Sequence, residues 1–308
     1  MAPLKENNRL QSIRWKLIIA VALFGATIWI SATVLNLTAV VTAMTALPTQ
    51  TALVITLLGA ASWLLRGLRT WMLFDQLPLS EALGLSFLHN TANNLAPMRL
   101  GELALPMLAR WLGGVEFSVG LTSLLWIRLL DFISLIGISL CIVLLPVAGT
   151  VMLALLAALV FLTPLILGFI VPRTQHIQLP EILAKARAQL IYEAQNGKRL
   201  HRMWRLTILS WLSKIMGMGV LLATLSGIPM TEVVTTILGA ELSSILPIHG
   251  FAGAGSYEAG GILGSAFMGL SPVVALEMTI QLHIYVLSLT AVFGILGALL
   301  LLKRTIDG

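Results

Sequence analysis

The sequence has very little charge for its length. Only 10% of its 308 residues are charged, whereas roughly a quarter of the residues in soluble domains are. Apolar residues make up 58% of the chain and its mean hydropathy is +0.96, which excludes the class of soluble globular domains. The composition predicts an all-α polytopic membrane protein, with residues 1–308 forming a single transmembrane domain.

Several kinds of site are also missing. The single Cys141 lies in an apolar run, which excludes a disulfide within the chain. The five histidines show no metal-ligand spacing, and no ATP-binding motif is present, so we expect no metal and no cofactor. The glycine-rich stretch 250–255 follows no strand, which excludes a dinucleotide-binding turn.

The net charge of +6 indicates the orientation in the membrane rather than a nucleic-acid partner. Most of the 19 basic residues lie between apolar runs, whereas the connections 39–50, 146–149 and 228–230 contain no Lys or Arg. The positive-inside rule therefore predicts that both termini are cytoplasmic. The basic residues that border the apolar runs are Arg9, Arg14, Lys16, Arg66, Arg69, Lys303, Arg304 and those between 173 and 205.

Six apolar runs are long enough to cross the bilayer, since about 20 residues span a core of roughly 30 Å. They are residues 17–38, 51–73, 117–145, 150–171, 206–227 and 275–302.

Two further apolar stretches, 79–115 and 231–270, are each interrupted by helix breakers. The flanking segments are too short to span, so each stretch is expected to form a re-entrant helical hairpin. The short segments are 79–94, 102–113, 231–246 and 256–269. Three crossings and one hairpin per half predict an inverted repeat of residues 17–145 and 150–302, with a cytoplasmic amphipathic linker at 172–205.

The predicted hairpin tips contain the first group of candidate site residues. Asn93, Asn94, Arg99 and Glu102 occupy the first tip, and Arg99 suits a phosphate because its guanidinium can donate two parallel hydrogen bonds. Alternatively, Arg99 ties to Glu102 and closes the tip. Glu258 follows the second tip, where it either contacts the substrate or stabilises a helix N-terminus. Pro97, Gly101, Pro247, Gly250, Gly253 and Gly255 are expected to shape the two tips.

Arg128 and Asp131 form the second group, at positions i and i+3 of one predicted span. Ionisable residues at this depth are costly, so they need a partner or a function. The two residues either pair only to fix helix packing or contact the substrate.

These motifs resemble the lysylphosphatidylglycerol synthase transmembrane-region family, which includes the flippase portion of the multiple peptide resistance factor. The resemblance covers most of the chain, although His249 before Gly250 departs from the usual double glycine. Its features are an Asn-rich Pro-x-Arg-x-Gly-Glu stretch, an Arg-x-x-Asp pair and a late Pro-Gly-rich stretch leading to Glu, here Asn93, Asn94, Pro97, Arg99, Gly101 and Glu102, then Arg128 and Asp131, then Pro247, Gly250, Gly253, Gly255 and Glu258.

The resemblance implies a flippase in a bacterial or archaeal cytoplasmic (inner) membrane that moves a phosphate-bearing headgroup between leaflets, through a cavity between the hairpins. A membrane phospholipid or a polyprenyl-type lipid is the expected partner. A homodimer and a separate lipid-synthesising enzyme are further candidate partners. Two alternatives stay open: an intramembrane lipid-modifying enzyme with Glu102, Asp131 or Glu258 as general base, and a non-catalytic scaffold.

Overall fold

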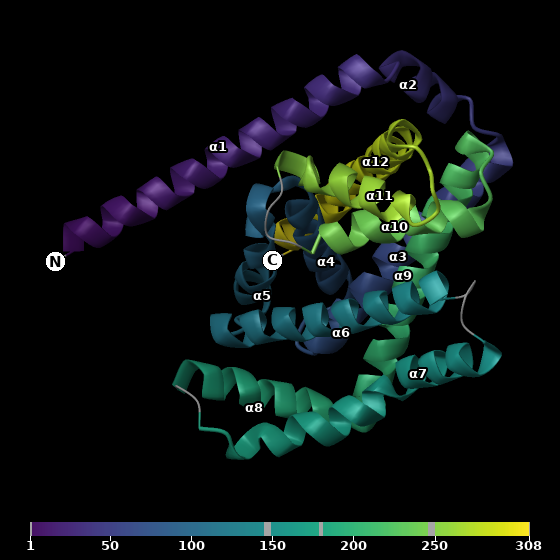
Figure 1. Cartoon of the computed structure of the whole chain (residues 1–308). Helices are drawn as coiled ribbons and strands as arrows, with labels where there is room; N and C mark the ends of the chain where they lie inside the picture. The colour runs from purple at the N-terminus through teal and green to yellow at the C-terminus, as the bar shows by residue number, and fades with distance from the viewer. Residues whose placement is uncertain (1, 145–148, 179–180, 246–249, 308) are drawn as a thin grey trace. The chain divides into compact units, whose positions relative to one another are not determined.

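The computed structural model describes residues 2–144, 149–178, 181–245 and 250–307, and it contains helices but no strand in these ranges (Figure 1). The first six elements are α1 (Ala2–Val34), α2 (Leu37–Thr45), α3 (Thr49–Leu73), α4 (Leu79–Leu95), η1 (Pro97–Leu103) and α5 (Ala104–Gly113). The remaining elements are α6 (Phe117–Leu144), α7 (Thr150–Arg173), η2 (Thr174–His176), α8 (Glu181–Gln195), α9 (Gly197–Ser226), α10 (Met230–Ser243), η3 (Phe251–Gly253), α11 (Ser256–Ala266) and α12 (Pro272–Asp307).

Among the described residues, five helical segments are long and apolar enough to cross a membrane, which confirms the polytopic class. They are Thr49–Leu73, Phe117–Leu144, Thr150–His176, Gly197–Ser226 and Pro272–Leu302. Each contains most or all of one predicted apolar run, because an uninterrupted apolar helix is the structure that satisfies its own backbone in lipid.

The first predicted span differs, since its helix breaks within residues 17–38. Ile18–Val34 and Leu37–Thr45 meet at an angle of 87°, and the two count as a sixth span only if they are taken together. Asn36 explains the break, because its side chain accepts a hydrogen bond from the Ala39 N–H at 3.1 Å and starts a new helix. The predicted loop 39–50 is therefore helical up to Thr45.

The four short segments predicted for the hairpins are helices α4, α5, α10 and α11. Helices α10 and α11 lie side by side (Figure 1). A Cβ atom on Gly239 would stand 2.2 Å from the Gly260 carbonyl oxygen, and one on Gly264 would stand 2.2 Å from the Thr235 oxygen. Glycines therefore allow the two backbones to touch. The membrane side on which each hairpin enters stays a prediction.

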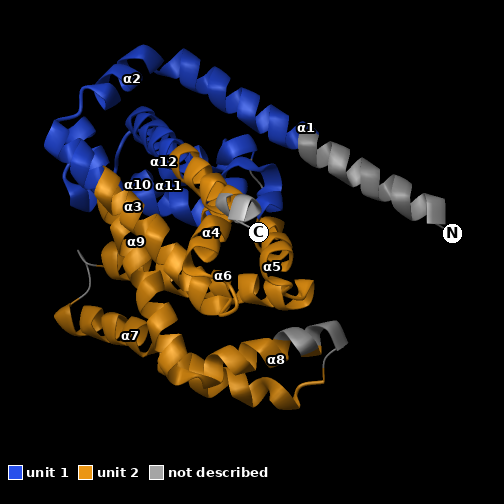
Figure 2. Ribbon diagram, turned by 180° about the vertical axis from the view of Figure 1, so that it is seen from behind, with its two compact units in different colours: residues 1–55, 91–101, 218–290 blue, residues 56–90, 102–217, 291–308 orange. Residues whose placement is uncertain are grey.

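The chain divides into two compact units built from interleaved segments (Figure 2). Unit 1 comprises residues 1–55, 91–101 and 218–290, and unit 2 comprises residues 56–90, 102–217 and 291–308. Unit 2 contains a core whose largest fully buried side chains are Phe74, Leu85, Leu105, Trp126, Leu130, Leu135, Leu200 and Met203. The division into repeat halves 17–145 and 150–302 remains a prediction.

The predicted linker is largely helical. Helix α8 lies within the predicted linker 172–205, and it runs beside α6 and α7 in unit 2 (Figure 1). Its amphipathic character stays a prediction. Helix α9 begins at Gly197, so residues 197–205 belong to a long helix rather than to the linker. The basic residues in this stretch do not end the helix, because Arg and Lys have good helix propensity.

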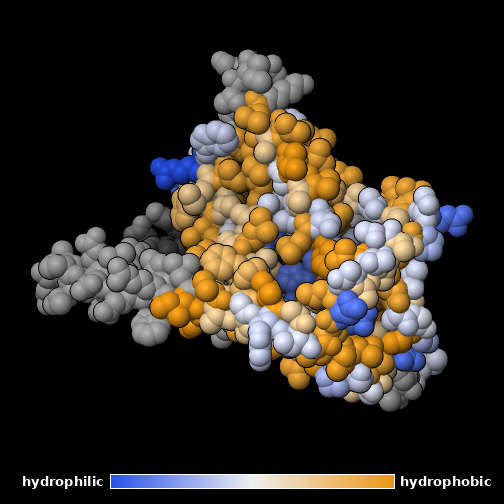
Figure 3. All heavy atoms as spheres, turned by 90° about the horizontal axis from the view of Figure 1, so that it is seen from above, coloured by the Kyte–Doolittle hydropathy of each residue, from blue (hydrophilic) through white to orange (hydrophobic). Residues whose placement is uncertain are grey.

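The outer surface is strongly apolar, as a lipid-facing surface requires. Only 11% of the most apolar window of Thr150–His176 is buried, and Val151, Phe161 and Phe169 are exposed. Hydrophobic side chains also cover much of the face drawn in Figure 3. The exposed surface of these helices is therefore suited to contact with the lipid bilayer.

Candidate functional site

Three helices and η1 contribute charged and polar side chains to one buried cluster in unit 2. Each helix presents them at helical spacing, so they share one face of that helix. The cluster consists of Arg66 and Arg69 on α3, Arg128 and Asp131 on α6, Thr207, Trp211 and Lys214 on α9, and Glu102 in η1.

Asp131 is the most fully bonded member of the cluster. Arg69 grips its carboxylate with two nitrogens, at 2.6 Å to Oδ1 and 3.2 Å to Oδ2. The Trp211 indole N–H donates to Oδ1 at 3.1 Å, and Arg69 also donates to the Thr207 hydroxyl at 2.9 Å. The side chains of Arg69 and Asp131 are only 4% and 6% exposed. This pair is therefore a desolvated structural tie.

Arg128 is held more loosely. The predicted pair with Asp131 is long, at 3.9 Å, because Arg69 has taken the carboxylate. Arg128 Nε lies 3.1 Å from Glu102 Oε1, and both side chains are 24% exposed. Its Nη2 is buried and donates to no group among the described residues. A buried guanidinium nitrogen without an acceptor is unusual, and an anionic ligand would supply the missing acceptor.

The cluster contains two further basic side chains. Arg66 and Lys214 lie 5.0 and 5.4 Å from the Trp211 ring centroid, as cation–π partners. The linked residues thus include four basic side chains and two carboxylates. His89 on α4 lies within electrostatic range of Arg128, Arg69 and Asp131.

The sequence interpretation missed Arg69 and Trp211. Arg66 and Arg69 border an apolar run, so their position in the sequence indicates only how the chain is oriented in the membrane. A cue is nevertheless present, because the largely apolar stretch 70–74 separates Arg69 from Asp75, the next charged residue. Arg69 is therefore inside its helix and cannot reach water without cost.

The first predicted tip lies mainly in unit 1. Met98 and Arg99 have left-handed backbones, with φ of +54° and +57°, which is a strained conformation for side-chain-bearing residues. A Cβ atom on Gly101 would meet the Ala92 backbone at 2.1 Å, so this position requires glycine. Pro97 is buried.

Polar residues of this tip contact other segments of unit 1. The Arg99 guanidinium donates to the Ile245 carbonyl, and Asn94 donates to the Thr290 hydroxyl at 2.8 Å. Asn93 Oδ1 is buried and accepts no hydrogen bond within the described part of the chain. The first tip therefore contacts the segment that leads into the second.

The second predicted tip is described only in part, since Pro247 and His249 lie outside the described residues. The Gly250 N–H donates to the Ala254 carbonyl at 2.8 Å, and Gly253 and Gly255 have φ of +84° and +92°. Glu258 accepts from the Gly255 N–H at 2.7 Å and lies 2.5 Å from His283. Glu258 thus stabilises the start of α11, one of its two predicted roles.

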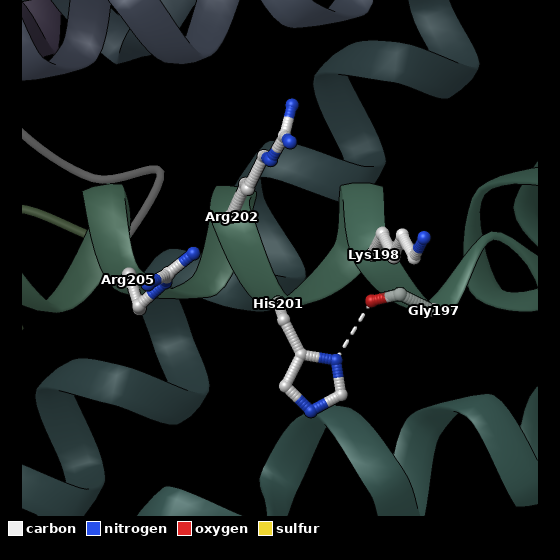
Figure 4. A pocket seen from close by; sticks show the side chains of 5 residues that line it. All are labelled: Gly197, Lys198, His201, Arg202 and Arg205. Atoms are coloured by element: carbon white, nitrogen blue, oxygen red, sulfur yellow. Dashed lines mark hydrogen bonds between the residues drawn. The ribbon is translucent and has the colours of Figure 1, made fainter.

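A separate, exposed pocket of about 440 Å³ borders the first turns of α9 in unit 2 (Figure 4). Lys198, Arg202 and Arg205 line it with His201, whose Nδ1 lies 2.7 Å from the Gly197 carbonyl. The nearby Arg199 pairs instead with the buried Glu193, at 3.2 Å, and with Asp75. Solvated basic residues in this arrangement suit anionic lipid headgroups.

Within the described ranges, no three His, Cys, Asp or Glu side chains lie close enough together to hold a metal ion. The family model described as "Lysylphosphatidylglycerol synthase TM region" matches residues 17–297. No curated protein and no solved structure matches the chain.

Proposed function

Because the chain belongs to the family of the lysylphosphatidylglycerol synthase TM region, we propose that it moves a lipid with a phosphate-bearing headgroup between the leaflets of the cytoplasmic membrane. The acyl chains stay in the bilayer while the headgroup passes through the protein. A phospholipid fits the family description, and a polyprenyl-type lipid carries the same phosphate chemistry.

The buried Nη2 of Arg128 is the observation that carries this proposal. Asp131 is already bonded to Arg69 and Trp211, so Arg128 can turn to a ligand without leaving Asp131 unpaired. A phosphate oxygen offers the acceptor that Nη2 lacks, and the planar guanidinium can bind two such oxygens. Glu102 then acts as the exchangeable partner that Arg128 keeps when no headgroup is present.

The re-entrant hairpins are part of the proposal. Gly113 at the end of α5 packs against Leu77, just before α4, so the chain returns close to the point from which it left. Thr235 in the first half of α10 lies against Gly264 near the end of α11, so these two helices are antiparallel neighbours. These contacts support hairpins that enter and leave on one side. Arg99 and Asn93 are the proposed headgroup contacts at the first tip.

Liposomes that contain the purified chain test this function directly. Labelled phosphatidylglycerol should exchange between leaflets, while a labelled diacylglycerol glycolipid without phosphate should gain no protein-dependent exchange. Arg128→Gln should slow the exchange about tenfold or more, since a charge-assisted hydrogen bond contributes roughly 1.5–3 kcal/mol. Arg110→Gln, at an exposed position of α5, is the matched control and should leave the rate unchanged.

Two results would contradict the proposal. Equal exchange of both lipids would show that the phosphate is not recognised. A new lipid product without exchange would instead favour an intramembrane enzyme.

A further inference from the structure

His283 on α12 connects two oxygen atoms of unit 1. Its Nδ1 lies 2.5 Å from Glu258 Oε1, and its Nε2 lies 2.5 Å from the Ala252 carbonyl oxygen. The other oxygen of Glu258 accepts from the Gly255 N–H. The side chains of His283 and Glu258 are 12% and 5% exposed, so water does not compete at these contacts.

The two contacts of His283 require one proton more than a neutral imidazole and a carboxylate carry together. A neutral imidazole carries one N–H, whereas a carbonyl and a carboxylate oxygen can only accept. Both contacts of His283 are therefore satisfied only when a second proton lies between Nδ1 and Oε1, on either atom. We propose that Glu258 and His283 form a proton-binding site, and that release of this proton loosens the turn Phe251–Gly253.

Release of the proton follows from the same count. When the proton passes to water, Glu258 remains as a carboxylate and His283 keeps one N–H. One ring nitrogen then directs a lone pair at an oxygen, so one of the two contacts must open. Ala252 is the weaker point, because its φ of +56° is strained for a residue with a Cβ atom and His283 helps to hold it.

A cavity borders the pair. Its volume is about 280 Å³, and Glu258 is the ionisable side chain in its lining. Residues of α1, such as Leu23 and Ile30, also line it. The cavity is large enough for water molecules, which would carry the proton to Glu258.

The other titratable groups on the same elements of unit 1 have partners of their own. The Tyr257 ring lies 5.1 Å from the His283 ring, and its hydroxyl donates to Glu241 at 3.2 Å. Glu277, on the same helix as His283, accepts from Gln281 at 3.4 Å. Residues 18–34 of α1 contain no ionisable side chain.

The experiment measures the proton on the purified full chain with histidine ring ¹⁵N signals and the infrared band of protonated carboxyl groups. At about pH 7, the signal that His283→Gln removes should report two ring N–H groups, or Glu258→Gln should remove a protonated-carboxyl band. His201→Gln is the matched control and should remove a different ring signal. If His283→Gln fails to fold, comparing the ring ¹⁵N signals and the carboxyl band of the wild type with those of Glu258→Gln still decides whether the pair holds a proton.

A singly protonated His283 ring together with an ionised Glu258 would overturn the proposal. A role of this proton in transport rests on the proposed function. If the proton is used in transport, the rate of lipid exchange by the wild type varies with pH, and His283→Gln loses that variation. If the wild type exchanges no lipid, the function fails while the spectroscopic result stands. If it exchanges lipid but the pair holds no proton, only the proton site fails.

Discussion

At the scale of single residues, the two arginines near Asp131 differ in the strength of their pairing. Arg69 makes a bidentate, buried contact at 2.6 Å, whereas Arg128 approaches the same carboxylate only to 3.9 Å. Distance and desolvation both make the first pair the structural one. Sequence spacing favoured the second pair, because it shows only neighbours on one helix.

This difference predicts unequal stability losses. Arg69→Leu should lower the free energy of unfolding by about 3–5 kcal/mol, because it leaves a buried carboxylate without its main partner. Arg128→Leu should cost clearly less, and the double variant Arg69→Leu with Asp131→Leu should recover most of the loss. Thermal unfolding in detergent measures all three. If Arg128→Leu were as damaging as Arg69→Leu, Arg128 would be the structural partner.

Glu193 on α8 gives a prediction about pH. Burial holds the pKa of this carboxyl above its usual value of 4.5, although the Arg199 guanidinium opposes the shift. The folded protein therefore binds this proton more tightly than the unfolded chain. The contribution of Glu193 to the free energy of unfolding is therefore fully present below about pH 4.5, and it is lost as the pH rises through the raised pKa.

Glu193→Gln should remove that decline, because the amide cannot ionise and Arg199 keeps its contact with Asp75. Unfolding temperatures between about pH 4 and pH 8 in detergent would measure the slope. Glu116→Gln, at an exposed carboxylate, is the control and should keep the wild-type slope. An unchanged slope in Glu193→Gln would assign the pH dependence to another group.

At the scale of elements, the contact between α10 and α11 depends on glycine. Gly239→Ala should destabilise the protein by about 1–3 kcal/mol, since the new Cβ atom would stand 2.2 Å from the Gly260 carbonyl and force the helices apart. Gly25→Ala on α1 meets nothing within 4 Å and should be neutral or slightly stabilising. Equal unfolding temperatures for the two variants would show that α10 and α11 can separate freely.

The helices were more predictable than the contacts between them. The ends of α4, α6, α10 and α11 follow from run length and helix breakers, so the sequence predicted them closely. The bend at Asn36 was missed, because one polar residue in an apolar run gives a weak signal. The contacts of Asp131 with Arg69 and Trp211 join residues 62 and 80 positions apart, a separation that periodicity cannot detect.

At the scale of the whole molecule, the central prediction is that each hairpin returns to the side from which it entered. Gln76 precedes α4 and Glu116 follows α5, while Thr231 lies in the first turn of α10 and Ser271 follows α11. All four positions are exposed, so each can carry a cysteine label. A re-entrant hairpin requires that the two positions of a pair lie on one side of the membrane, whereas an odd number of crossings separates them.

Single cysteines at these positions, in a Cys141→Ser background, test this arrangement with a membrane-impermeant maleimide on intact cells. The positive-inside rule predicts that Gln76→Cys and Glu116→Cys react only after permeabilisation, because Arg110 lies near the end of α5 and Arg199 pairs with Asp75 beside Gln76. Thr231→Cys and Ser271→Cys should react from outside, since the connection 228–230 carries no basic residue. Labelling of Gln76→Cys and Glu116→Cys from opposite sides would mean that the first hairpin crosses the membrane, and the inverted repeat would then fail.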